Sequence, residues 1–388
     1  MKLKSLEDLP EGKAPVLVRV DFNVPVKDGE VADSFRIEAV LPTLRELLST
    51  GAPLVLISHL GRPKGPDPAL SLRPVALRLG ELLGESVRFI DAAPDGGEVG
   101  RQVGALGPGG IALLENLRFW PGEKAADRGF AASLAGLGRA LVQDAFGVLH
   151  RRDASTALLP TMMPAFAGRL VEGEVKALEA VRDGSERPFV VVIGGAKIVD
   201  KLGLIEKMAE RCDRLFVGGA LANTFLLARG LEVGGSLVER DQKDAAHDLL
   251  TRFASKIRIP KTVVVEGEDG GVRECRASEV RPREAILDVG EETIREWAPE
   301  LRLASRLFWN GPMGHFEDPR FTRGTVALAR EVAASRGMTV VGGGDSLSAV
   351  RQAGEASQMT HLSTGGGASL AFLEGERLPG LEPLEKGA

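Results

Sequence analysis

Four arginines occupy comparable places along the first half of the chain, in or near the loops that follow short apolar runs. They are Arg36, Arg62, Arg118 and Arg151. A guanidinium group can bind a carboxylate or a phosphate through two parallel hydrogen bonds. A single arginine at a strand end usually forms a surface ion pair, but four on successive loops are hard to explain in that way. We interpret them as a receptor for a small molecule with several negative charges.

The corresponding loops of the second half are rich in glycine instead. They are Gly194-Gly195-Ala196-Lys197, Gly218-Gly219, Gly342–Ser346 and Gly365-Gly366-Gly367. Glycine pairs after strands often only form the turn. However, glycine also lets backbone N–H groups approach a phosphate, and a following helix adds the partial positive charge of its N-terminus. Both triple-glycine loops precede short helical patterns, so the second half is predicted to bind a nucleotide.

Three positively charged residues lie at or near predicted helix starts, where the helix dipole disfavours positive charge. Arg36 falls in the first turn of the helix predicted after Asp33-Ser34, and Lys201 in the first turn of the helix after Gly194-Gly195. Lys197 lies between those glycines and that helix. A cation at a helix N-terminus costs roughly 0.3–1 kcal/mol. A bound anion would remove the conflict, so all three are candidate ligand contacts.

Alternating strand-like and helix-like segments must position these loops. Continuous runs of Val, Ile and Leu are typical of parallel strands buried on both faces. The runs are Pro15–Asp21, Ala52–Ser58, Val87–Ile90, Gly110–Glu115, Ala140–Asp144, Phe189–Gly194, Arg214–Val217, Thr262–Val265, Arg306–Trp309 and Met338–Val341. With amphipathic helices between them, they predict an α/β architecture whose ligands bind at the carboxyl ends of the strands.

The chain is too long for one hydrophobic core. It has 388 residues, whereas single cores rarely exceed about 250–300. A helix-like run, Glu172–Val181, separates two halves of similar size. We predict two doubly wound, parallel-sheet, Rossmann-like α/β domains joined by an interdomain helix. The predicted boundaries are 1–170 for the N-terminal domain, 171–187 for the helix and hinge, 188–375 for the C-terminal domain and 376–388 for a tail.

Composition argues against several classes of partner. The net charge of −5 disfavours nucleic acid and an anionic membrane surface. No apolar stretch resembles a signal peptide or approaches the ~20 residues that cross a bilayer. Two cysteines, Cys212 and Cys275, are too few for a disulfide framework. We therefore expect a cytoplasmic protein with neither a nucleic-acid nor a membrane partner.

Common nucleotide and metal signatures are missing from the sequence. It contains no G-x-x-x-x-G-K-[ST] P-loop, no G-x-G-x-x-G dinucleotide motif and no protein-kinase motif set. Its five histidines lack metal-ligand spacing. The glycine-rich loops therefore predict a nucleotide site of another kind.

Taken together, the loops resemble the motifs of the phosphoglycerate kinase family, in family order and across nearly the whole chain. The matching segments are Val18–Pro25, Ser58–Pro63, Glu115–Phe119, Asp144–Gly147, Gly194–Lys197, Trp309–Gly314, Gly342–Ser346 and Ser363–Ser369. The resemblance implies reversible phosphoryl transfer between ATP and the carboxylate of 3-phosphoglycerate, giving ADP and 1,3-bisphosphoglycerate, in glycolysis and gluconeogenesis. It also implies in-line transfer after domain closure, Mg²⁺ as the cofactor and a monomer.

The resemblance further implies a role for individual residues. The triose phosphate is expected at Asp21, Asn23, Arg36, His59, Arg62, Arg118 and Arg151, with His150 nearby. The nucleotide is expected at Lys201, Glu317, Gly343, Gly344, Asp345 and Ser346, with Asp345 near Mg²⁺ and Glu317 on the ribose. Lys197 and Arg36 are the implied catalytic pair, which neutralises the migrating phosphoryl group. The chain departs from the usual family pattern at Asp153, where a second histidine is common, and at Ile286 and Glu291 near the adenine.

This chemistry agrees with the residue types. A carboxylate nucleophile is already ionised at neutral pH, so the reaction needs alignment and positive charge rather than a general base. Two alternatives remain at this stage. One is an acyl-phosphate kinase that acts on another carboxylate. The other is a non-catalytic binding protein that closes on an anion, which would have no use for a nucleotide site.

Overall fold

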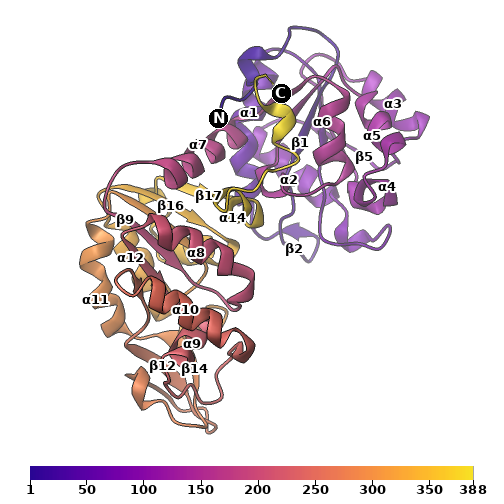
Figure 1. Cartoon of the computed structure of the whole chain (residues 1–388). Helices are drawn as coiled ribbons and strands as arrows, with labels where there is room; N and C mark the ends of the chain where they lie inside the picture. Colours follow the sequence, from indigo (N-terminus) through magenta and orange to yellow (C-terminus); the bar gives the residue numbers. More distant parts are fainter. Residues whose placement is uncertain (388) are drawn as a thin grey trace. The chain divides into compact units, whose positions relative to one another are not determined.

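The computed structural model describes residues 1–387 and divides the chain into two compact units. Unit 1 contains Met1–Lys176 and the described residues from Gly375 onward, and unit 2 contains Ala177–Glu374. Each unit holds one six-stranded sheet with helices around it (Figure 1), and every strand pair in these two sheets is parallel. The predicted doubly wound α/β architecture is confirmed. No described helix is long and apolar enough to span a membrane.

The sheet of unit 1 has the strand order β5-β6-β4-β1-β7-β8. Its strands are β1 (Val16–Val20), β4 (Leu54–Ile57), β5 (Val87–Ile90), β6 (Ile111–Leu114), β7 (Ala140–Asp144) and β8 (Ala165–Ala167). Central Val18 pairs with Leu56 on one side and Val142 on the other. The helices are α1 (Phe35–Ser49), α2 (Arg73–Leu83), α3 (Gly97–Gly104), α4 (Pro121–Lys124), α5 (Arg128–Ala135), α6 (Leu159–Met162) and α7 (Arg169–Asp183). Every residue of β1 is buried, as a strand covered on both faces requires.

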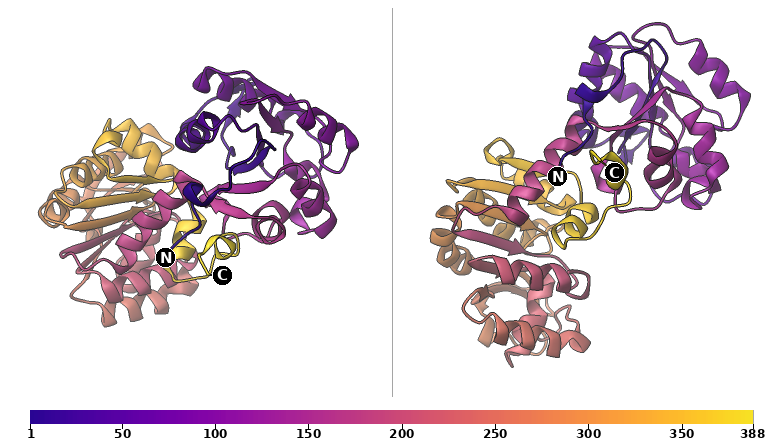
Figure 2. Two further views of the ribbon diagram at one scale, coloured as in Figure 1. Left: turned by 90° about the horizontal axis from the view of Figure 1, so that it is seen from above. Right: turned by 45° about the horizontal axis from the view of Figure 1, so that its top comes forward.

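The sheet of unit 2 has the order β11-β10-β9-β15-β16-β17. Its strands are β9 (Phe189–Ile193), β10 (Arg214–Val217), β11 (Ile257–Arg258), β15 (Arg306–Asn310), β16 (Met338–Gly342) and β17 (His361–Ser363). The helices are α8 (Leu202–Arg211), α9 (Gly219–Ala228), α10 (Lys243–Arg252), α11 (Glu291–Arg302), α12 (Arg323–Ala333), α13 (Gly344–Gln352) and α14 (Gly367–Leu373). Figure 2 shows this sheet between two layers of helices, which is the result of right-handed crossovers running in both directions from the centre.

One predicted strand belongs to a different sheet. The run Thr262–Val265 forms β12 (Thr262–Glu266), which is the middle strand of a separate antiparallel sheet with β13 (Val272–Arg276) and β14 (Ala285–Val289). The prediction that it runs parallel in the main sheet is wrong. A short apolar run looks the same in both settings, and the hairpin is closed by a turn in which Gly270 has a positive φ of 77°.

Several short elements do not stand out in the sequence. They include the three-residue strands β8 and β17, and a hairpin of β2 (Val26–Lys27) and β3 (Glu30–Val31). Two or three residues are too few to show a periodicity. The hairpin turn is Asp28-Gly29, with positive φ at both residues, a pair that favours the tight turn of a two-residue hairpin.

The C-terminal segment, expected as a tail, packs against unit 1. Lys4 N donates to Leu384 O at 2.7 Å, Lys386 N donates to Lys2 O at 2.8 Å, and Gly380 N donates to Leu149 O at 2.9 Å. Leu378, Leu381 and Leu384 are buried, so the segment adds apolar surface to the core of unit 1. Leu3 and Glu385 form an antiparallel bridge, so the first and the last described segments lie side by side (Figures 1 and 2). The boundary between the units falls inside α7, after Lys176, and not at the helix ends.

Side chains of unit 1 bind the first N–H groups of α7. Asp144 Oδ1, at the end of β7, accepts from Leu170 N at 3.0 Å and from Val171 N at 3.2 Å. Thr43 Oγ1 of α1 accepts from Arg169 N at 2.8 Å. The first N–H groups of a helix have no partner within it, so these side chains satisfy donors that would otherwise be unpaired. Burial raises the pKa of Asp144 to about 7.

We expect Asp144→Ala to destabilise unit 1 by about 1–3 kcal/mol, because two buried N–H groups lose their acceptor. Asp144→Asn, which keeps an acceptor oxygen, is the matched control. The folded protein retains a proton on Asp144 that the unfolded chain releases above about pH 4. The stability due to this group is therefore present at low pH and lost as the pH rises through about 7.

Urea unfolding from about pH 4 to pH 8 measures both effects. Relative to the unaltered protein, Asp144→Asn should gain stability as the pH rises. Parallel pH curves for these two proteins would contradict the assignment of this proton to Asp144.

Candidate active site

In each large sheet the strand order reverses at one place. The reversal lies between β1 and β7 in unit 1, and between β9 and β15 in unit 2. Ligands of doubly wound sheets bind outside the carboxyl ends of the strands at such a point, because the two neighbouring loops turn away from each other there. The predicted arginines follow β1, β4, β6 and β7, and the predicted glycine-rich loops follow β9, β10, β16 and β17.

Asp21, which follows β1, organises the site in unit 1. Its Oδ2 accepts a hydrogen bond from Arg36 Nη1, and its Oδ1 accepts from Asn23 N at 3.2 Å. His59 Nδ1 lies 3.8 Å from Asp21 Oδ1. The Asn23 side chain accepts from Gly61 N at 2.9 Å. The structure thus brings together four of the predicted residues, from the loops after β1 and β4 and the first turn of α1.

Arg118 is almost fully buried in the same site, and hydrogen bonds restrain its side chain. Its side chain is 4% exposed; Nη1 donates to Gly61 O at 2.6 Å, and Nη2 lies 3.4 Å from Asp153 Oδ2. Its buried Nε has no partner among residues 1–387. Burial, and next the charge of Arg151, lower the pKa of Arg118. Asp153 offsets part of this positive charge.

The remaining predicted residues of unit 1 are less restrained. His150 is half-buried, its Nδ1 has no partner in the described chain, and burial followed by the Arg151 charge lowers its pKa. Arg62 is exposed and forms no hydrogen bond or ion pair with other residues in the range 1–387. The site combines a rigid part around Asp21 and Arg118 with side chains that remain available to a ligand.

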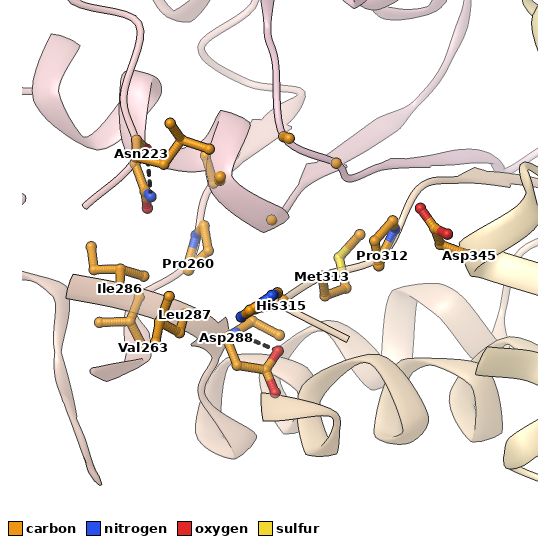
Figure 3. A pocket seen from close by; sticks show the side chains of 18 of the residues that line it. Asn223, Pro260, Val263, Ile286, Leu287, Asp288, Pro312, Met313, His315 and Asp345 are labelled. Atoms are coloured by element: carbon orange, nitrogen blue, oxygen red, sulfur yellow. Dashed lines mark hydrogen bonds between the residues drawn. The ribbon is translucent and has the colours of Figure 1, made fainter. Parts of the chain in front are cut away.

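Unit 2 contains a cavity of about 350 Å³ at the reversal point of its sheet. The loops after β9 and β15 contribute Gly195, Ala196, Pro312, Met313 and Gly314 to its lining. Figure 3 shows Ile286 and Val263 at one end of the cavity and Asp345 at the other. The cavity therefore has an apolar end and a polar end.

The apolar end is built largely from the antiparallel sheet and α9. Val263 of β12, Ile286 of β14 and Leu226 of α9 line it. Ile286 is held in place because its N–H donates to Ser236 Oγ at 2.8 Å. Asn223 also lines the cavity, and its buried Oδ1 has no partner among the described residues. A flat apolar group with a hydrogen-bond donor would suit this end.

The polar end is lined by the carboxylates of Glu317 and Asp345, the latter in the first turn of α13, and the half-buried Lys201 lies beside it. Lys201 Nζ donates to Gly194 O at 2.6 Å and to Asn310 Oδ1 at 2.8 Å, and burial lowers its pKa to about 8. Asp345, in the first turn of α13, has a raised pKa because of burial and the nearby Glu317. Both carboxylates line the cavity.

The glycine-rich loop supplies the start of α13. Gly343 precedes the helix with a positive φ of 95°, and no side chain caps the helix. The first N–H groups are therefore free of a side-chain acceptor, which favours an anion there. Ser346 Oγ accepts from Gly311 N at 2.6 Å, so Ser346 ties α13 to the loop after β15.

Among the described residues, no direct contact supports the predicted roles of Lys197 in catalysis and of Asp345 in metal binding. Lys197 is exposed, and no side-chain hydrogen bond or ion pair holds it within residues 1–387. Over that same range, no group of three His, Cys, Asp or Glu side chains could hold a metal ion. A cation beside Asp345 would need ligands from a bound molecule as well.

No role was predicted from the sequence for several polar residues that shape these sites. They are Arg19, Asn116, Glu123, Ser155, Asn223 and Asn310. Asn116 joins two loops of unit 1, since its Oδ1 accepts from Leu60 N and Arg118 N, both at 3.1 Å. Arg19 carried the clearest signal, because a charged residue inside the apolar run Pro15–Asp21 must find buried partners. The others depend on contacts between distant segments.

These features define a class of protein: a two-unit α/β protein with an arginine-rich site in one unit and a cavity with an apolar and a polar end in the other. The sequence model described as Phosphoglycerate kinase matches residues 6–376. The phosphoglycerate kinases of Thermus thermophilus and Rubrobacter xylanophilus are 51% and 50% identical to this chain. Both comparisons cover 99% of this chain, and they cover 100% and 98% of the respective relatives.

Solved structures agree with these sequence matches. Phosphoglycerate kinase from Coxiella burnetii has a TM-score of 0.86 at 37% identity, and that from Pyrococcus horikoshii has a TM-score of 0.90 at 32% identity. Each comparison covers 98% of both chains. The chain belongs to the phosphoglycerate kinase family. It is a phosphotransferase that carries out the phosphoryl transfer of glycolysis, so the alternative of a non-catalytic binding protein is wrong.

We expect Ile286→Gly to change the KM for ATP several-fold, because this β-branched side chain occupies the apolar end of the cavity. The KM for 3-phosphoglycerate should change much less. Val272→Gly is the matched control, since Val272 lies in the neighbouring strand β13, is 43% exposed and does not line the cavity. Steady-state kinetics of both variants and the unaltered enzyme measure the two KM values. Equal nucleotide kinetics in Ile286→Gly and the unaltered enzyme would show that the base does not bind at this end.

Proposed function

We propose that unit 1 binds 3-phosphoglycerate or 1,3-bisphosphoglycerate through the side chains predicted from the sequence. They are Asp21, Asn23, Arg36, His59, Arg62, Arg118, His150 and Arg151. The observation that carries this proposal is the arginine cluster: burial and the charges of Arg19, Arg118, Arg151 and Arg36 hold the pKa of His59 well below its ordinary value. Asp21 and Asp153 offset only part of the positive charge of this cluster, which favours a ligand with several negative charges.

Unit 2 binds ATP or ADP in its cavity. The base occupies the apolar end near Ile286, the ribose lies at Glu317, and the phosphates lie at Lys201 and at Gly343, Gly344, Asp345 and Ser346. The uncapped start of α13 and the buried Lys201 ammonium support this orientation. Both place positive potential at the same end of the cavity.

Mg²⁺ fits beside Asp345. Magnesium in kinases is usually held by one or two carboxylates together with substrate phosphates. The raised pKa of Asp345, caused by burial and Glu317, marks a carboxylate that lacks compensation and would gain it from a cation. Bound there, Mg²⁺ would neutralise charge on the nucleotide phosphates.

The reaction needs positioning and electrostatic stabilisation rather than proton transfer. The attacking group is a carboxylate, so no general base takes part. Arg36 of unit 1 and Lys197 of unit 2 neutralise the phosphoryl group as it moves between substrates, when charge is spread over its equatorial oxygens. Since the two substrates bind to different units, in-line transfer follows closure of the units, which also excludes water. The enzyme acts in the cytoplasm as a monomer on small molecules.

We expect Arg118→Ala to weaken 3-phosphoglycerate binding about tenfold or more, because a charge-assisted hydrogen bond contributes roughly 1.5–3 kcal/mol. ATP affinity should be nearly unchanged. Isothermal titration with each substrate measures both, and Arg88→Ala, which removes an exposed arginine from β5, is the control. Equal weakening of both substrates would contradict the assignment to two sites.

The two lysines of the nucleotide unit should affect different kinetic constants. Lys197→Ala should lose about a hundredfold or more in kcat, because its contact strengthens in the transition state, and it should bind both substrates within a few-fold of normal. Lys201→Ala should instead raise the KM for ATP. Steady-state kinetics, with folding verified by circular dichroism, compare the pair. A near-normal kcat in Lys197→Ala would remove this residue from catalysis.

A further inference from the structure

A buried arginine of the central strand contacts the histidine of the anion site. Arg19 Nη2 lies 3.3 Å from His59 Nδ1, and both side chains are almost fully buried. A guanidinium group only donates hydrogen bonds, so His59 Nδ1 must accept this one. An imidazole that accepts at Nδ1 carries its proton on Nε2. This contact therefore selects one tautomer.

Within residues 1–387, no carboxylate lies within hydrogen-bond distance of His59 Nδ1. Asp21 Oδ1 is 3.8 Å away and accepts from Asn23 N. The other oxygen of Asp21 accepts from Arg36. Besides Arg19, the charges of Arg118, Arg151 and Arg36 act on His59, and all of them oppose its protonation. The ring is thus held neutral, with Nε2–H as its donor.

Arg19 is itself held by a directed chain of hydrogen bonds. Its Nε donates to Ser155 Oγ at 2.9 Å, and Ser155 Oγ donates to Glu123 Oε1 at 2.6 Å. Ser155 N also donates to Glu123 Oε2 at 3.0 Å. Ser155 has one hydroxyl proton, and it donates this proton in the hydrogen bond to Glu123. The lone pairs of the same oxygen can therefore accept from Arg19. Glu123 compensates the buried positive charge of Arg19 through this serine.

We propose that Arg19 is a positioning residue: it fixes His59 as the Nε2–H tautomer, so that His59 offers the triose substrate a neutral hydrogen-bond donor. The inference rests on the proposed function, which places His59 in the triose site. His59 Nε2 has no hydrogen-bond partner elsewhere in residues 1–387, so its proton is available to a ligand oxygen. A neutral donor adds a directional contact without burying another positive charge among the arginines.

The unaltered protein provides the first test, which does not depend on any variant folding. In protein labelled with ¹⁵N-histidine, long-range ¹H–¹⁵N NMR distinguishes the tautomers, and His59→Gln identifies the His59 signals. We expect a protonated Nε2 and an unprotonated Nδ1, unchanged from about pH 5.5 to about pH 8.5. A protonated Nδ1, a mixture of tautomers or a titration near the ordinary histidine pKa would overturn the proposal.

Arg19→Lys keeps the charge but loses the fixed guanidinium contact. We expect a second His59 tautomer, a KM for 3-phosphoglycerate raised about three- to tenfold, a smaller change in kcat and an unchanged KM for ATP. Ser155→Ala, a milder change that only loosens Arg19, should shift the same quantities in the same direction. Arg88→Lys, an exposed arginine of the same unit, should change none of them.

If Arg19→Lys shows a single Nε2–H tautomer of His59 and a normal KM for 3-phosphoglycerate, the positioning role of Arg19 is wrong. The Arg118→Ala variant reports separately on the triose site. If it retains normal triose binding, the proposed site is wrong, whereas a normal Arg19→Lys beside a weakened Arg118→Ala contradicts only the role of Arg19.

Discussion

The constraint on which this structure depends is the burial of parallel strands on both faces. Such strands leave no room for solvated side chains, so polar groups collect in the loops at their carboxyl ends. Each sheet has one reversal of strand order, and both sites lie at these reversals. The two candidate sites are therefore confined to short edges of a large apolar framework.

The charged residues that remain inside the strands show how the constraint is met. Arg19 in β1 is compensated by Ser155 and Glu123. Arg306 in β15 donates to Ala180 O and Val181 O, both at 2.8 Å, and its guanidinium carbon lies 4.1 Å from the centre of the Phe189 ring. Each buried charge is thus fixed by partners from other elements, and each links the strand to a functional or connecting segment.

Helix α7, which continues from one unit into the other, is anchored by such residues in both. In unit 1 the Asp144 carboxyl binds its first N–H groups. In unit 2 Arg306 binds carbonyl groups near its last turn. The carboxyl oxygen satisfies unpaired N–H groups at the N-terminus, and the positive guanidinium at the C-terminus is what the helix dipole favours there. The helix that joins the units is therefore tied to the central part of each sheet.

The sequence alone determined the strand–helix alternation, the two-part division and the residues at the strand ends, because these depend on local apolar runs and on residue type. It also determined the family, through motifs such as Val18–Pro25. Tertiary structure decided which sheet each strand joins: β12 has the apolar pattern of its neighbours, yet it pairs in an antiparallel sheet and helps line the cavity of unit 2. It also decided that the last described segment completes unit 1. The hydrogen-bond partners of Arg19, Arg118 and Asp144 come from segments far apart in the chain. Only folding brings them within hydrogen-bond distance, so no local sequence pattern can predict these contacts.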